Sequence, residues 1–139
     1  MKPKKNHKNW YMAMTHFLTA GLFFPFALSM LMPLFLEESH FFSLPPLLFY
    51  GILLIIFVLG IWIGNIIVIR YMNKNYIVND KKAIVKFSTI YFAILVILST
   101  GLVNKNLLFD IVVGIIEIIL FYMISKKYIW KIQTEINPN

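Results

Sequence analysis

The sequence predicts an all-α membrane protein whose four transmembrane helices form one domain over residues 1–139. The first observation is composition: 60% of the 139 residues are hydrophobic, only 14% are charged, and the mean hydropathy is +0.77. Soluble domains carry roughly 25% charged residues, and so small a core cannot bury this many apolar side chains. The second observation is that charges divide the apolar residues into four long runs.

Each run has the length that a membrane requires. A transmembrane helix needs about 20 largely apolar residues, within a range of roughly 17–25. The four runs cover residues 12–36, 47–69, 87–103 and 107–125. The apolar stretch behind the basic N-terminus is too long for a signal-peptide core and lacks a small-residue cleavage site. We therefore expect it to be retained as the first span.

The first two runs contain residues that shape a helix. Pro25 and Pro33 interrupt the first run, and each removes a helical hydrogen bond and favours a kink. Gly60 and Gly64 form a G-x-x-x-G pair in the second run. This pair permits the close approach of another helix, either of this chain or of a second copy.

Positive charge is distributed unequally between the two sides of the predicted spans. All but one of the 13 Lys and Arg residues precede the first span, lie between the second and third, or follow the fourth; the exception is Lys105. By the positive-inside rule both termini then face the cytoplasm, as in a multi-pass protein of the inner (cytoplasmic) membrane. Topology and anionic membrane lipids account for the net charge of +7, so no nucleic acid is expected as a partner.

The fourth run carries two carboxylates, Asp110 and Glu117. Their spacing places them within about 20° of each other on a helix and roughly 10 Å apart along its axis. Glu117 lies near the middle of the span, where a charged side chain costs at least ~2.5–3.5 kcal/mol, so it must face protein or water. Asp110 lies near the outer end, where water or Lys105 can pair with it. Both are candidates for binding a substrate or a proton.

Other polar residues are expected at a similar depth to Glu117. Counted from the cytoplasmic boundary, His16, Thr19 and Asn65 lie within about one helical turn of it. With Thr15 they would line a polar pocket in the inner half of the bundle, which is a candidate binding or proton-relay site. The alternative is a buried hydrogen-bonding cluster that fixes helix register or contacts between copies.

The two halves of the chain show a similar pattern. Each begins with a basic residue or His followed by Phe, as HFLTAG at 16–21 and KFSTIY at 86–91. Each ends its second span in a polar residue, a cation and an aromatic, as NIIVIRY at 65–71 and FYMISKKYIW at 121–130. Both hairpins enter the membrane from the same side, so the repeat would be parallel, about an axis along the membrane normal.

On these residues the chain resembles the GtrA-like family of small four-span proteins. Members open with a basic-Phe-x-x-x-Gly run and close both hairpins with an aromatic, an Asn, a cation and an aromatic-rich pair. The resemblance implies presenting or flipping undecaprenyl-phosphate-linked sugars for the decoration of cell-surface polymers. The chain departs from the pattern where Ser125 replaces the usual Asn, where Ile69 precedes Arg70, and where Leu22 replaces a second Gly.

Such a role has physical requirements that the sequence can meet. A lipid phosphate needs cations at the cytoplasmic interface, where Arg70, Lys126 and Lys127 are expected. A sugar crossing the bilayer needs hydrogen-bonding groups along its path, such as Asn65, Glu117 and Asp110. The alternative for the three cations is that they are ordinary topology signals whose side chains reach the headgroups.

The sequence lacks the motifs of common enzyme and metal-binding classes. It has no cysteine, no Ser-His-Asp set, no metal-ligand spacing and no glycine-rich phosphate loop, so no enzyme activity, cofactor or metal is expected. We expect a transporter or flippase for a polyprenyl-phosphate sugar, working as a homo-oligomer or in a larger complex because four spans make a narrow bundle. The alternative is a non-transporting binding protein, either a toxin immunity protein or an accessory subunit of a larger membrane complex.

Overall fold

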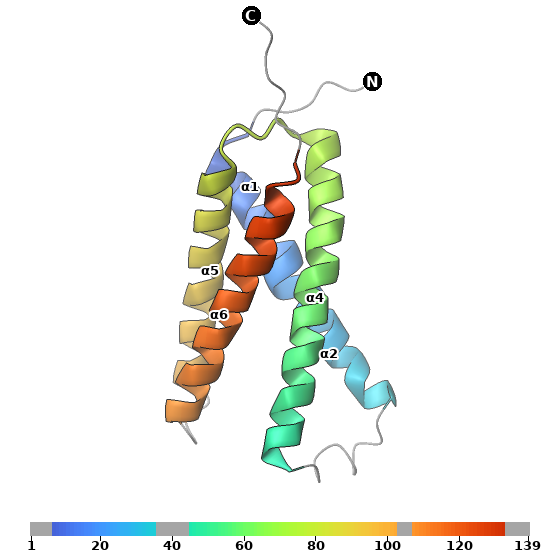
Figure 1. Ribbon diagram of the computed structural model, residues 1–139, viewed down its shortest axis with the longest axis vertical. Coiled ribbons are helices and arrows are strands. Elements are labelled where there is room, and N and C mark those ends of the chain that lie inside the picture. The colour runs from blue at the N-terminus through green and yellow to red at the C-terminus, as the bar shows by residue number, and fades with distance from the viewer. Residues whose placement is uncertain (1–6, 36–44, 103–106, 133–139) are drawn as a thin grey trace, which may run out of the picture.

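The computed structural model describes residues 7–35, 45–102 and 107–132, and their regular elements are helices (Figure 1). The first apolar run is helical in three consecutive stretches, and each later run is one helix. The elements are α1 (Asn9–His16), the π-helix η1 (Phe17–Phe23), α2 (Phe24–Phe35), α4 (Pro46–Asn75), α5 (Lys81–Leu102) and α6 (Leu107–Ile129). The all-helical class and the four helical segments predicted from the sequence are confirmed.

Three helical segments are long and apolar enough to cross a membrane, namely Asn9–Leu31, Leu48–Asn75 and Lys81–Ser99. Their length and composition indicate a helical membrane protein. The predicted span ends at residues 36 and 103, and the side chain of Lys105, lie outside the described residues.

The helices extend beyond the predicted spans at one end of the molecule. The second apolar run ends at residue 69 but α4 continues to Asn75, the third run begins at residue 87 but α5 begins at Lys81, and α6 reaches Ile129. An apolar run measures only the hydrocarbon layer, which is about 30 Å thick. Helical hydrogen bonds continue past it, and the 30 residues of α4 extend for about 45 Å.

The helices pack as a bundle in which α5 lies beside α6, α1 packs on α5, and α2 and η1 pack on α4, which also contacts α6. The start of α1, the end of α4, the start of α5 and the end of α6 lie together at the top of Figure 1. We call this the basic end, because every Lys and Arg of the described residues lies in these segments or directly beside them: Lys8, Arg70, Lys74, Lys81, Lys82, Lys86, Lys126, Lys127 and Lys131.

The G-x-x-x-G pair of α4 is the crossing point with α1, η1 and α2, which run on from one another and together are called the first segment. A Cβ atom added to Gly60 would lie 2.5 Å from the Cα atom of Pro25, and one added to Gly64 would lie 2.7 Å from the Cα atom of Ala20. Backbone atoms cannot withdraw from such contacts as a side chain can. The close approach that the pair allows is therefore made within the chain, where the sequence left a contact between copies equally open.

The first segment departs from α-helical geometry just before Pro25. The π-helix η1 ends at Phe23, and α2 then continues through Pro33 to Phe35. Pro25 has no N–H to donate to the carbonyl of Gly21, and its ring crowds that carbonyl. A local π-helical stretch, with its i→i+5 hydrogen bonds, is one way in which a helix absorbs such a disruption.

Aromatic rings fill the middle of the bundle. The rings of Phe92 and Phe121 are stacked with centroids 4.5 Å apart, and Phe57 lies 5.7 Å from Phe92. Gly21 faces this layer, since an added Cβ atom would lie 3.1 Å from the Phe121 ring. The first segment, α4, α5 and α6 therefore meet around an apolar layer.

Candidate functional site

The polar residues predicted to share one pocket lie in separate places. His16 and Asn65 are fully buried, and the Asn65 Oδ1 atom accepts a 2.9 Å hydrogen bond from His16 Nε2. Asn65 Nδ2 donates to the carbonyl of Ile61 at 2.9 Å. The proton on Nε2 leaves Nδ1 as an acceptor in the neutral ring, and Nδ1 has no hydrogen-bond partner within the described part of the chain. This hydrogen bond joins the first segment to α4.

Glu117 faces a different space, which we call the Glu117 pocket. It has a volume of about 330 Å³, and its walls come from η1, α2, α4, α5 and α6. Phe121, one helical turn from Glu117 toward the basic end, has its ring 5.8 Å from that of His16. An aromatic side chain thus lies between the level of Glu117 and the level of the His16–Asn65 pair.

The other polar residues predicted for the pocket lie neither at the His16–Asn65 pair nor in the Glu117 pocket. Thr19 is half-buried and lines a hollow beside Leu18 and Phe23 on the outer side of the first segment. The hydroxyl of Thr15 donates to the carbonyl of Tyr11 in its own helix. Asp110 is half-buried in the first turn of α6, on the side of the molecule opposite the basic end.

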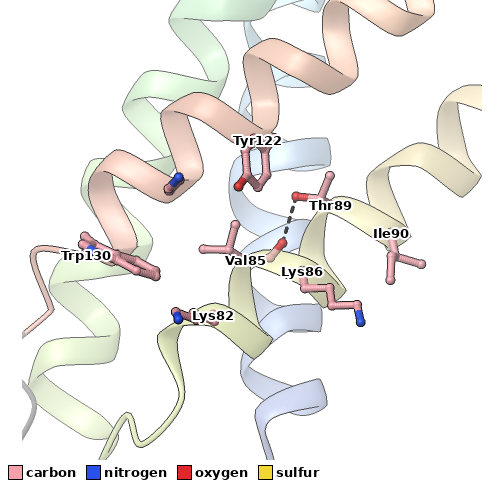
Figure 2. A pocket seen from close by; sticks show the side chains of 8 residues that line it. Lys82, Val85, Lys86, Thr89, Ile90, Tyr122 and Trp130 are labelled. Atoms are coloured by element: carbon pink, nitrogen blue, oxygen red, sulfur yellow. Dashed lines mark hydrogen bonds between the residues drawn. The ribbon is translucent and has the colours of Figure 1, made fainter.

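Of the three cations predicted to bind phosphate, one lines a groove. Arg70, Lys126 and Lys127 are all exposed at the basic end. Lys126 lines a groove of about 560 Å³ between α5 and α6, whereas Arg70 and Lys127 do not. The lining residues of this basic groove, shown in Figure 2, are Lys82, Val85, Lys86, Thr89, Ile90, Tyr122, Lys126 and Trp130.

The spacing of these residues follows from helix geometry. Lys82, Lys86 and Ile90 are four residues apart on α5, and Tyr122, Lys126 and Trp130 are four apart on α6. Residues four apart share a face of a helix, so two such faces meet where α5 packs beside α6. Figure 2 shows Trp130 and Lys82 toward one end of the groove and Ile90 toward the other.

The groove is positively charged at its rim and apolar along its floor. It has three lysines and no carboxylate among its lining residues, and Val85 on its floor is buried. The Nζ atom of Lys126 lies 5.6 Å from the centre of the Tyr122 ring, within cation–π range. The Thr89 hydroxyl donates to the carbonyl of Val85 at 2.8 Å. This arrangement can hold an anionic group beside an apolar chain.

The sequence did not lead us to predict four of the groove residues as binding residues, namely Lys82, Lys86, Tyr122 and Trp130. Their spacing along each helix was a usable signal, because cations or aromatics four residues apart at a membrane interface form one surface. The sequence did not indicate that these two surfaces face each other.

No group of three metal-ligating side chains occurs within residues 7–35, 45–102 and 107–132. No protein family, curated protein or solved structure matches this chain. The chemistry of the residues that line the groove and the pocket is therefore the basis of the proposed function.

Proposed function

We propose that this protein is a four-span protein of the cytoplasmic membrane that binds the phosphate of an anionic lipid in the basic groove. The observation that carries the proposal is the set of three lysines, without a carboxylate, around an apolar floor between α5 and α6. The resemblance found in the sequence favours a polyprenyl-phosphate-linked sugar as the lipid, for use in cell-surface polysaccharide synthesis.

The proposal includes α6 as a fourth span. Its 23 residues are about 35 Å long, enough to cross a hydrocarbon layer of about 30 Å. Its carboxylates Asp110 and Glu117 are both half-buried, which favours their facing protein. The positive-inside rule then puts the basic end, and with it both termini, on the cytoplasmic side. The parallel repeat of two hairpins is consistent with this topology.

A lipid suits the groove better than a soluble phosphate. Lysine ammonium groups make charge-assisted hydrogen bonds to phosphate oxygens, and Tyr and Trp are favoured where headgroups meet acyl chains. Beyond Ile90, the outer face of α5 continues in exposed apolar side chains, including Ile94 and Ile97. A bound lipid would have its phosphate among the lysines and its chain along this face.

The groove supports presentation of the lipid more directly than passage of its headgroup through one bundle. The basic groove and the Glu117 pocket have no lining residue in common. The stacked rings of Phe92 and Phe121 fill the bundle close to Glu117. A polar path across the bilayer would therefore have to form between copies in an oligomer.

The test is lipid binding by the purified protein, measured by native mass spectrometry with phosphatidic acid and, in parallel, undecaprenyl phosphate. The triple variant Lys82→Gln, Lys86→Gln, Lys126→Gln removes the charge of the groove. At about 1 kcal/mol for each lysine near an anionic surface, affinity should fall by roughly 100-fold. Uncharged diacylglycerol should bind neither protein specifically.

The matched control is the triple variant Arg70→Gln, Lys74→Gln, Lys127→Gln. It removes the same number of exposed charges from the basic end, outside the groove. We expect its affinity to stay within a few-fold of the unmodified protein. Equal losses in both triples would show general attraction to the basic end. Absence of anionic-lipid binding would favour the alternative of a toxin immunity protein or accessory subunit.

A further inference from the structure

With Glu117 ionised, the Glu117 pocket offers acceptors of hydrogen bonds but no donors. Its polar side chains are Glu117, Ser29 and Ser99. The hydroxyl proton of Ser29 is donated to the carbonyl of Phe26 at 2.8 Å, and that of Ser99 to the carbonyl of Val96 at 2.8 Å. Both serines therefore present only lone pairs to the pocket, beside the carboxyl group of Glu117.

Glu117 has no hydrogen-bond or ion-pair partner within residues 7–35, 45–102 and 107–132. No Lys, Arg or His lines the pocket, and Glu117 is its one ionisable lining residue. A carboxylate at mid-helix, away from water, is costly without a partner. A ligand that stabilises the ionised form of Glu117 in this pocket would bring positive charge and N–H donors.

The rest of the wall is apolar and partly aromatic. Phe26, Phe57 and Phe92 line the pocket, and aromatic faces attract cations. Leu22 and Phe26 are exposed on the outside of the bundle, so the pocket opens on the side where lipid would lie. The wall includes Gly21, in the π-helix, and Pro25; π-helical stretches are frequent at functional sites. A ligand that enters here has to partition into the membrane.

We propose that the Glu117 pocket binds a protonated amine carried on a compact apolar body. The ammonium group would donate to Glu117 and to the serine oxygens, and the apolar body would fill the aromatic part of the 330 Å³ volume. The basic groove and this pocket have no lining residue in common, so this second ligand site is independent of the proposed lipid site.

The probe is tritium-labelled 1-adamantylammonium, whose binding to the purified protein in neutral detergent is measured by equilibrium dialysis. We expect saturable binding that unlabelled 1-adamantylammonium displaces. The competitor 1-adamantanol has the same apolar body without the charge, and we expect it to displace the probe much less well. Absence of saturable binding, or equal displacement by the alcohol, would overturn the proposal.

Variants then locate the site. Glu117→Gln should raise the Kd of the probe by about 10- to 100-fold, the loss expected for a hydrogen bond to a charged group. Glu117→Asp keeps the charge and should retain measurable binding. Asp110→Asn removes a carboxylate from the same helix outside the pocket, and should leave the Kd unchanged.

Two outcomes among the variants would overturn the proposal: a Glu117→Gln protein that binds as tightly as the unmodified one, or an Asp110→Asn protein that loses as much affinity. Folding is checked by the helical circular dichroism spectrum and by the elution profile. Anionic-lipid binding, measured on the same samples, reports separately on the basic groove.

Discussion

The basic groove and the Glu117 pocket are opposite in both charge and setting. The groove has three exposed cations and no carboxylate, whereas the pocket has one half-buried carboxyl group and no cation. The difference in setting follows from the lengths of the two kinds of side chain. A lysine has a long apolar stem and can hold its charge at the interface while it packs against the helix. A glutamate at mid-helix has a shorter reach, so the bundle has to form a pocket around it.

The largest effect, on stability and on amine binding together, is expected from a change that damages the pocket and leaves the groove in place. Gly60→Ala would put a methyl group 2.5 Å from the Cα atom of Pro25, which lines the Glu117 pocket. Overpacking of this kind costs about 1–3 kcal/mol, so we expect a lower thermal midpoint in detergent and loss of amine binding. Lipid binding should persist, because the groove lies on α5 and α6.

Gly51→Ala is the matched control for this change. Gly51 also lies in α4, but a Cβ atom there would meet nothing within 4 Å. Alanine is favoured over glycine in a helix by up to about 1 kcal/mol, so the midpoint should stay the same or rise. A Gly60→Ala protein as stable as Gly51→Ala would contradict the crossing of α4 with the first segment.

An intermediate effect is expected at the His16–Asn65 pair, which belongs to neither site. Asn65→Leu leaves the Nε2 donor of His16 buried without its acceptor, which should lower the free energy of unfolding by about 1–3 kcal/mol. The thermal midpoint measures this loss. Below that midpoint, both amine and lipid binding should be retained.

The double variant His16→Leu, Asn65→Leu replaces both polar partners and should lose less stability than Asn65→Leu alone, because no unpaired donor remains. If a folded Asn65→Leu protein loses one of the two binding activities, the pair is part of that site and its role is not only structural.

The smallest effect is expected from salt, and it separates the two sites by exposure. Raising the ionic strength from 0.1 M to 1 M shortens the screening length from about 10 Å to about 3 Å. Lipid binding at the exposed lysines should weaken several-fold, and amine binding at the half-buried Glu117 should weaken less. Dialysis and lipid titration at both salt concentrations measure this, and an equal decline would mean that the pocket is as open to water as the groove.

Sequence reasoning predicted the helices better than the site. The runs of apolar residues located all four helical segments, and the lysines marked the end where α4, α5 and α6 extend past those runs. Of the residues predicted to share a polar pocket, His16 and Asn65 do meet, but Glu117 lines a separate space. Lys126 does line a groove, but beside Lys82 and Lys86 and without Arg70.

The sequence by itself determined the depth of each residue along the bundle, because a helix advances about 1.5 Å per residue and the apolar runs give the lengths and order of the helices. Only the tertiary structure decided which residues face each other at a given depth. That depends on how each helix is rotated and which neighbour it packs against, and here the contacts of Gly60 and Gly64 with the first segment help to fix it. The position of a residue along its helix depends on that helix alone, whereas the residue that it contacts depends on how two helices pack.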